Sequence, residues 1–217
     1  MNSRDPHAFG SLSPGVERYY DYVTSLSVVI ASTIGILIIR HLDAQPGTET
    51  IATHGALDAA GHLLTGLMIG MGIRGLRLPI PPWTVVLGSL APDIGHALSH
   101  YEILSVVTGS SRTGTHSAFA LILIASVGFI DRRRANLWLG LAIGGITHLW
   151  RDMGTGTVPL LWPFDLTVDG TTFSRYMIAL VGGALAMVGS GMLLDTYRLA
   201  NGLTRPFPPP PQSSTEE

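Results

Sequence analysis

Two long apolar runs, one near each end of the chain, constrain the fold more than any other feature of the sequence. The first, residues 23–39, contains no charged side chain and ends at Arg40, and the second, residues 176–194, lies between Arg175 and Asp195. An α-helix needs about 20 predominantly apolar residues to cross a bilayer. We therefore predict a membrane-spanning helix at each run.

Four weaker apolar spans lie between these runs, at residues 57–73, 83–91, 117–130 and 135–150. Charged residues make up 13% of the chain, against about 25% in soluble proteins. The fold class predicted is therefore all-α, a polytopic membrane helix bundle of about six spans, of which the third is short or re-entrant. Small residues four positions apart favour close helix packing in lipid. Such pairs occur at Gly66 and Gly70, at Gly140 and Gly144, and at Gly182 and Ala186.

The polar stretches outside the spans divide the chain into three parts. We predict a polar N-terminal segment at residues 1–22, the membrane bundle at 23–200, and a disordered proline-rich tail at 201–217, which contains "RPFPPPPQSSTEE". The first part is too long and too polar for the n-region of a signal peptide, and no small-residue cleavage site separates the first apolar run from Arg40. A cleaved leader is therefore not expected.

All 13 basic side chains are arginine, and the chain contains neither lysine nor cysteine. This excludes Schiff-base and P-loop lysine chemistry, thiolate nucleophiles, disulfides and cysteine-ligated metal centres. The net charge of -2 provides no basic surface, so we expect no nucleic-acid partner. The expected partners are the lipid bilayer and an amphiphilic or lipid substrate.

The arginines are unevenly divided between the two sides of a six-span bundle. One side holds Arg40, Arg112, Arg151 and Arg175, and the other holds the remaining nine, which include the triplet 132–134. The arginine-rich side of a membrane protein faces the cytoplasm. We therefore predict a multi-pass protein of the inner (plasma) membrane with both termini in the cytoplasm.

Ionisable residues are costly inside membrane helices and mark functional sites there. The chain has such residues in or at the ends of four predicted spans: His62, Asp93, His96, His116, His148 and Asp152. Because the helices alternate in direction, all six are expected on the extracytoplasmic side. Three of the histidines lie roughly 18–24 Å along the helix from the nearest cytoplasmic arginine, less than the hydrocarbon thickness of about 30 Å. The group should be recessed beneath the outer head groups.

The spacing within this group suits a metal ion. His148 and Asp152 are four residues apart, which places both on one helix face, and Asp93 and His96 share a face if Pro92 begins a helix. Imidazole and carboxylate are ligands of zinc, and also of manganese or iron. We predict a divalent metal site, with zinc as the first choice and the six residues as its ligands.

The remaining histidines are assigned separately. His7 and His41 lie outside the pattern and are predicted to be surface residues, whereas His54 and Asp58, four residues apart, are ambiguous. His100 is either a further ligand or an interfacial residue. A histidine on an apolar helix can also be a hydrogen-bonded structural residue, but independent structural histidines would not all lie at one depth. A shared depth favours the metal site.

Four short motifs carry a resemblance to a known family. They are "GHLLTG" with His62, "LAPDIGH" with Asp93 and His96, "RTGTHS" with Arg112, His116 and Ser117, and "THLWRD" followed by "GTGTVPLLWPF" with His148 and Asp152. Over about residues 61–164 the chain resembles the predicted membrane-bound metal-dependent hydrolases, also called YdjM-like or LexA-binding inner-membrane-associated hydrolases. The resemblance implies a membrane hydrolase that depends on a metal ion.

The chain departs from the family pattern at two positions. Gly95 stands where the family often has a second acidic residue, and Ser111 stands where it often has a histidine. One ligand or base of the family can therefore be missing, and the number of metal ions stays open. The pairing of His148 with Asp152 also looks like the ligand spacing of zinc-dependent phospholipases C, an analogy of pattern and not of fold.

These observations predict a membrane-embedded hydrolase that uses metal-activated water. Asp152 or Asp93 would, as an alternative to binding the metal, act as general base. Arg112 or Arg151 would hold an anionic substrate, most plausibly a phospholipid or a lipid-linked phosphoester. The alternative is a non-catalytic membrane protein with a structural metal site, either a structural or interaction protein or an ion carrier. A carrier needs polar groups along a path between both faces, and the cytoplasmic half of the bundle offers almost none.

Overall fold

The computed structural model describes residues 14–46, 50–100, 115–161, 164 and 168–203, and for residues 14, 51, 52 and 94–100 it describes the backbone alone. Its helices are α1 (Pro14–Asp43), α2 (Ile51–Gly75), α3 (Pro82–His100), α5 (Ala118–Ile130), the short 3-10 helix η1 (Arg132–Arg134), α6 (Ala135–Met153) and α7 (Phe173–Ala200). An isolated β-bridge between Val158 and Val168 lies in the connection from α6 to α7. The prediction of an all-α fold is confirmed for the residues described.

The helix starts are set by local capping. Ser117 caps α5 by accepting a hydrogen bond from the backbone N–H of Ala120 at 3.3 Å, and Thr50 and Thr172 cap α2 and α7 in the same way. Helix α1 begins at Pro14, inside the segment predicted to be polar. Residues 204–217 of the predicted tail lie outside the described residues, so the division of the chain into three parts stays a prediction.

Three helices are long and apolar enough to cross a membrane, Gly15–Asp43, Thr53–Gly75 and Phe173–Ala200. They coincide with the first, second and last predicted spans. Helix α5 is apolar, but its 13 residues measure only about 20 Å, short of the hydrocarbon core of about 30 Å. Helices α3 and α6 have 19 residues each and carry several polar side chains. The structure thus supports three crossings, and six remain a prediction.

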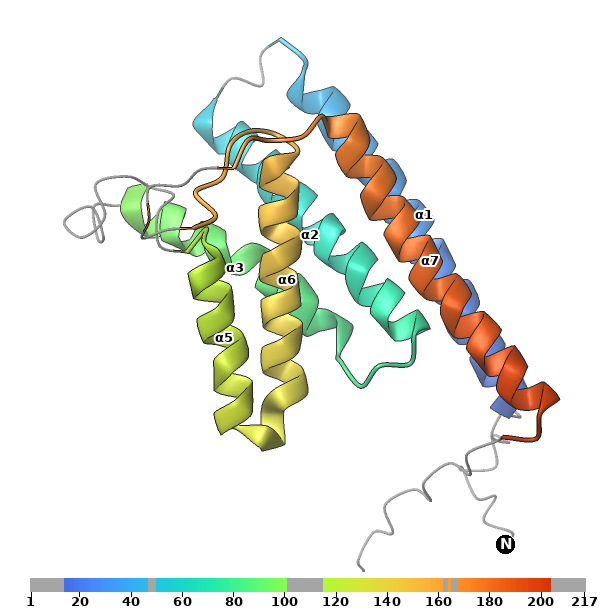
Figure 1. Cartoon of the computed structure of the whole chain (residues 1–217). Coiled ribbons are helices and arrows are strands. Elements are labelled where there is room, and N and C mark those ends of the chain that lie inside the picture. The colour runs from blue at the N-terminus through green and yellow to red at the C-terminus, as the bar shows by residue number, and fades with distance from the viewer. Residues whose placement is uncertain (1–13, 47–49, 101–114, 162–163, 165–167, 204–217) are drawn as a thin grey trace, which may run out of the picture.

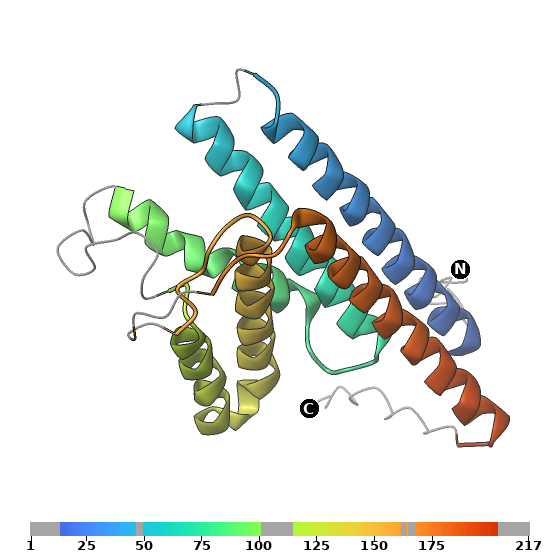
Figure 2. The same cartoon turned by 45° about the horizontal axis from the view of Figure 1, so that its top comes forward.

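The helices are arranged around α2, which packs against α1, α3, α6 and α7. Helices α1 and α7 run side by side along one edge of the molecule, whereas α5 and α6 form a hairpin at the other edge (Figures 1 and 2). Large apolar side chains are exposed on the outer helices, for example Ile34 of α1, Ile122 of α5 and Ile178 of α7. An apolar outer surface is what a protein surrounded by lipid presents.

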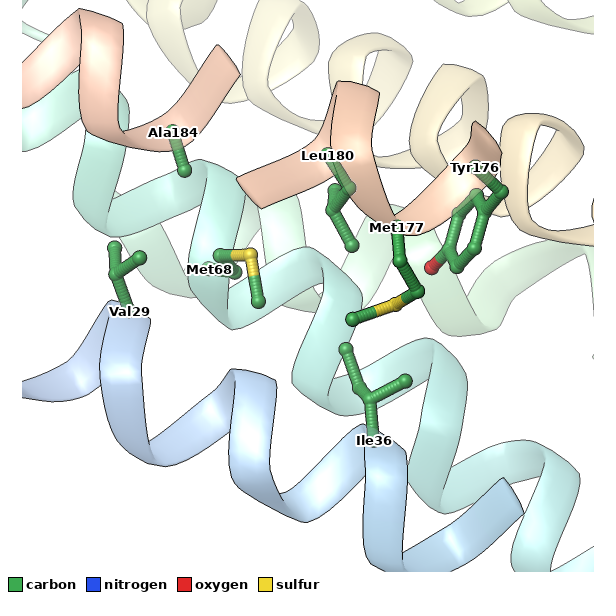
Figure 3. Packing of buried hydrophobic residues seen from close by; sticks show 7 residues of the cluster. All are labelled: Val29, Ile36, Met68, Tyr176, Met177, Leu180 and Ala184. Carbon is green, nitrogen blue, oxygen red and sulfur yellow. The ribbon is translucent and has the colours of Figure 1, made fainter. Parts of the chain in front are cut away.

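A hydrophobic core joins α1, α2 and α7. Figure 3 shows Val29 and Ile36 of α1 facing Met68 of α2, with Leu180 and Ala184 of α7 closing the group from the other side. All five side chains are at most 3% exposed. This core fixes α1 and α7 against the central helix α2.

Close contacts between helices occur at two of the three predicted pairs of small residues. A Cβ atom added to Gly66 or Gly70 of α2, or to Gly140 or Gly144 of α6, would press against atoms of α3. The prediction for the third pair is wrong, because Gly182 of α7 has no atom near its Cβ position and both it and Ala186 are exposed. The inner face of α7 is formed by other residues.

Pro92 does not begin a helix, which was the condition given for a shared face of Asp93 and His96. Helix α3 begins at Pro82 and continues through Pro92 to His100. Pro92 has no N–H, so the carbonyl oxygen of Gly88 lacks its usual helical partner, a cost of about 3 kcal/mol in an isolated helix that packing against α2 and α6 must offset. Asp93 is therefore presented from the middle of a packed helix and not from its first turn.

A second polar network lies at the opposite end of the bundle from the polar residues of α2 and α6. Tyr22 donates a buried hydrogen bond of 2.8 Å to Asp195, and Asp21 accepts hydrogen bonds of 2.7 and 2.8 Å from Arg74 and Arg77. The half of the bundle predicted to be cytoplasmic was expected to contain almost no ionisable residue, and this network corrects that expectation at the end of the half. The network connects α1, α2 and α7 at the point where the apolar core formed by these three helices ends.

Candidate metal centre

Polar side chains from four segments meet beside the middle of α2 and the end of α6. They are His62 of α2, Asp93 of α3, His116 directly before the cap of α5, and His148 and Asp152 of α6. We call this group the His–Asp cluster. The three histidines are 0%, 1% and 0% exposed, and the more open side of the cluster is formed by Asp93, whose side chain is 28% exposed.

The imidazole rings of the cluster are in direct contact. His62 and His148 stack with ring centroids 3.8 Å apart, and His116 meets His148 edge to face at 4.9 Å. The Nε2 atoms of His62 and His148 each lie 3.3 Å from a carboxylate oxygen of Asp152, and those of His148 and His116 lie 3.6 and 3.7 Å from Asp93. Three ring nitrogens and two carboxylates therefore converge on one small volume.

The outer nitrogens of two rings fix which nitrogen carries the proton. His148 Nδ1 lies 2.8 Å from the backbone carbonyl oxygen of Ser89, which can only accept, so Nδ1 is the donor. His116 Nδ1 lies 3.1 Å from the Thr115 hydroxyl, whose one proton goes to the carbonyl oxygen of Pro92, so this Nδ1 also donates. In a neutral imidazole each Nε2 then carries a lone pair, and this lone pair is the one available to a metal ion.

The spacing within the cluster differs from that of ordinary histidine–carboxylate ion pairs. Charge-assisted hydrogen bonds measure about 2.7–2.9 Å, whereas the Nε2–O distances here run from 3.3 to 3.9 Å. Two ligands bound to the same ion at about 2.0–2.2 Å are roughly 3.3–3.6 Å apart in a tetrahedral site. The Nε2 atoms of His62 and His148 are also buried without a hydrogen-bond partner among the described residues. These residues have the donor types and spacing that could hold a metal ion.

Asp58 is the member of the site that the sequence left open. Its carboxylate lies 3.6 Å from His62 Nε2, one helical turn away on α2, and it accepts a hydrogen bond of 3.2 Å from Arg151. With His62 and Asp93 it forms one of three overlapping groups whose ligand atoms lie within 4.8 Å of one another. The spacing of four residues between Asp58 and His62, the same as in the His148–Asp152 pair, is the signal that could have identified it.

Other predicted residues lie apart from the cluster or outside the described part. His54 is hydrogen bonded through Nδ1 to Asp43 at 2.8 Å and its side chain is 67% exposed, so it is not a member. His41 is exposed and lies 3.3 Å from Gln45, as expected of a surface residue. The remaining predicted positions fall on residues or side chains that are not described: His7, Gly95, His96, His100, Ser111 and Arg112.

A cavity of about 240 Å³ opens directly beside the cluster. Asp152 and Arg151 form its inner wall, and Arg40 of α1 and Phe173 of α7 form part of its outer wall. Since Asp152 belongs to both the cluster and the cavity, a molecule in the cavity can reach the residues that could hold a metal. The cavity therefore lies next to the buried cluster and shares Asp152 with it.

Comparison with known proteins identifies one similar family. A family model described as YdjM inner membrane protein matches residues 57–201, which run from the first turns of α2 to the residue after α7. The match includes every member of the His–Asp cluster and leaves α1 outside. No curated protein and no solved structure matches the chain.

Proposed function

The chain belongs to the family of YdjM inner membrane proteins, and from this premise we propose that it is a membrane-embedded hydrolase that depends on a divalent metal ion. The proposed ligands are His62, Asp93, His116, His148 and Asp152, with His96 as a sixth. Zinc is the proposed ion because imidazole and carboxylate donors suit it, and manganese and iron are the alternatives.

The observation that carries the proposal is that hydrogen-bond acceptors, the Nε2 atoms and the carboxylate oxygens, face one another inside the cluster. His148 Nδ1 donates to a carbonyl oxygen, so its Nε2 presents a lone pair to Asp152 at 3.3 Å and to Asp93 at 3.6 Å. Acceptors facing acceptors in a buried site repel one another unless a cation lies between them. A divalent ion supplies that cation and satisfies the unpaired ring nitrogens at the same time.

The proposed reaction is hydrolysis of a phosphoester by water. A divalent ion in such a site acts as a Lewis acid and lowers the pKa of water toward neutrality. The oxygen of water forms a bond to phosphorus, the P–O bond to the alcohol breaks, and the departing alkoxide takes up a proton. In this step one of the two carboxylates, Asp152 or else Asp93, serves as general base instead of as a ligand and accepts the proton that water loses. A chain without cysteine or lysine has neither a thiol nor an amine nucleophile to offer instead.

Arg151 holds the negative charge of the substrate in this proposal, because it lines the cavity next to Asp152. Arg112 remains a second candidate for the same role from the sequence motif. The protein is proposed to lie in the inner membrane with both termini and residues 132–134 in the cytoplasm, which puts the His–Asp cluster toward the extracytoplasmic side. This placement is supported by the position of Arg132–Arg134 at the start of α6, the end opposite His148 and Asp152.

An ion carrier is less well supported. Between the His–Asp cluster and the network of Tyr22 and Asp195, the described interior of α1, α2 and α7 is filled by apolar side chains such as Met68 and Leu180. A carrier requires polar groups along its path. The remaining alternative is a structural or interaction protein that uses the metal only for stability.

The proposal is tested by replacing Asp152 with asparagine. Asp152→Asn keeps the shape of the side chain but removes its charge and its ability to accept a proton, so hydrolysis of an activated aryl phosphoester and of phospholipids in mixed micelles should be lost. Asp169→Asn, at an exposed aspartate outside the cluster, is the matched control and should retain wild-type activity.

Metal content by mass spectrometry and reversal of chelation by added zinc complete the test. Purified wild-type protein without stoichiometric metal after loading would refute the metal site. Metal-loaded protein that turns over none of the phosphoesters would refute the hydrolase assignment for this substrate class and favour the structural alternative.

A further inference from the structure

The cavity beside the cluster combines charged and apolar walls. Its lining comes from the end of α1, the start of α2, the end of α6 and the first residue of α7. Apolar surface is supplied by Ile36, Ile39, Leu57 and Phe173. Positive charge is supplied by Arg40 and Arg151, and negative charge by Asp43, Asp58 and Asp152. The volume of the cavity, about 240 Å³, is slightly below the usual range of about 300–1,000 Å³ for ligand pockets. It has room for a head group and the first part of a chain, but not for a whole lipid.

Arg151 is held in place beside the cavity. Its side chain is 7% exposed, one terminal nitrogen donates to Asp58 at 3.2 Å, and its Nε has no hydrogen-bond partner among the described residues. The guanidinium occupies the space next to Gly61, where a Cβ atom would collide with it. A buried guanidinium interacts strongly with anions, because hydrogen bonds to charged groups gain strength away from water.

Arg40 supplies a second cation from a different helix. Its guanidinium lies 5.4 Å from the ring centroid of Phe173 and 4.0 Å from Asp43, and its side chain is 54% exposed. The bond between His54 and Asp43 fixes the end of α1 against the start of α2 and so positions Arg40 at the mouth of the cavity. The two arginines therefore lie at the mouth and at the inner end, with apolar side chains between them.

We propose that this cavity binds the anionic phosphoester head group of an amphiphile, with Arg151 and Arg40 on its oxygens and the start of its apolar chain against Ile39 and Leu57. This inference rests on the proposed hydrolase function and names its substrate class. The cavity is lined by two guanidinium groups and three carboxylates, so an anionic head group complements its charge when the adjacent candidate centre holds a divalent ion. The apolar wall supports a lipid rather than free phosphate.

The test measures binding separately from hydrolysis. The probe is a non-hydrolysable phosphonate analogue of phosphatidic acid in nanodiscs, and inorganic phosphate and diacylglycerol are the competitors. We expect Gly61→Ala, which displaces the Arg151 guanidinium, to weaken binding of the probe about tenfold. Gly55→Ala on the same helix, with no atom within 4 Å of its Cβ position, should bind it like the wild type. Arg40→Gln, at a half-exposed side chain, should weaken binding about threefold to tenfold.

Inorganic phosphate should compete at least about 100-fold more weakly than the lipid probe, because burying roughly four methylene groups contributes that much. Wild-type affinity in both Gly61→Ala and Arg40→Gln, with metal content unchanged, would overturn the inference while leaving the metal site in place. Phosphate that competes as well as the lipid, or diacylglycerol that competes equally, would also overturn it. Loss of metal in the wild type would instead count against the proposed function, and the lipid measurement would still decide the role of the two arginines.

Discussion

Replacing Gly144 with alanine should separate two helices and thereby open the metal centre. A Cβ atom at this position of α6 would collide with the carbonyl oxygen of Val85 and lie 2.7 Å from Gly88 Cα and from Ser89 N, all backbone atoms of α3. Backbone atoms of a packed helix cannot swing aside. To restore ordinary contacts of about 3.5–4.0 Å, the two helices must move apart by roughly 1 Å.

This displacement acts directly on the cluster, because Asp93 comes from α3 and His148 from α6. Their closest Nε2–O distance of 3.6 Å would grow to about 4.6 Å. Two ligands of one ion with bonds of about 2.0–2.2 Å can be at most about 4.4 Å apart. We therefore expect metal affinity to fall about 10- to 100-fold or more, and the overpacked interface to cost about 1–3 kcal/mol of stability.

The assay is competition with a chelator, followed by thermal unfolding in detergent with and without zinc. Gly182→Ala is the matched control, since its Cβ position is in open space. Alanine favours a helix by about 1 kcal/mol over glycine, so the control should be as stable as the wild type or slightly more stable. Wild-type metal affinity in Gly144→Ala would show that the aspartate of α3 and the histidine of α6 do not share an ion, and the reasoning would fail.

Three further predictions test other parts of the molecule. His148→Ala should lower the metal content measured by mass spectrometry while the protein stays in the membrane, and His41→Ala should leave it unchanged; equal occupancy in the two variants would contradict the ligand assignment. Tyr22→Phe should lower the free energy of unfolding by about 1.5–3 kcal/mol, because it removes a 2.8 Å hydrogen bond to the Asp195 carboxylate and leaves only the longer contacts with Arg77 and Arg198, but it should not change metal affinity. A reporter active only outside the cytoplasm should be silent when fused after Arg205 and active when inserted near Ser110, and the reverse pattern would invert the proposed topology.

The polar cluster could be predicted from sequence because its members interrupt apolar helices. His62 and His148 are costly in their surroundings unless they meet partners, and the alternation of helix directions brought them to one end. Whether Asp58 belongs to the candidate metal site could not be decided in the same way. It lies near the start of α2, where a residue can face the interior or the surface, and only packing against Arg151 of α6 decides between them.

The rotation of a helix about its axis and the limits of a helix also could not be predicted from the sequence. Spacing alone gives Gly182 and Ala186 the same packing potential as Gly140 and Gly144, but α7 turns Ala184 inward and leaves Gly182 exposed. Rotation about a helix axis is determined by the neighbouring side chains and not by the pattern of small residues. Tertiary packing likewise carries α3 through a proline that local rules would place at its first turn.

Helix α1 lies outside the region that the family model matches, so part of the cavity wall comes from a different stretch of the chain than the cluster. Residues 57–201 contain every member of the His–Asp cluster, whereas Ile39 and Arg40 of the cavity wall belong to a helix that ends at Asp43. The outer wall of the cavity and the His–Asp cluster are therefore specified by separate stretches of the chain, which are joined by the core of α1, α2 and α7. A chimera that joins this first helix to the core of another YdjM protein would change the outer wall of the cavity while every member of the cluster is kept.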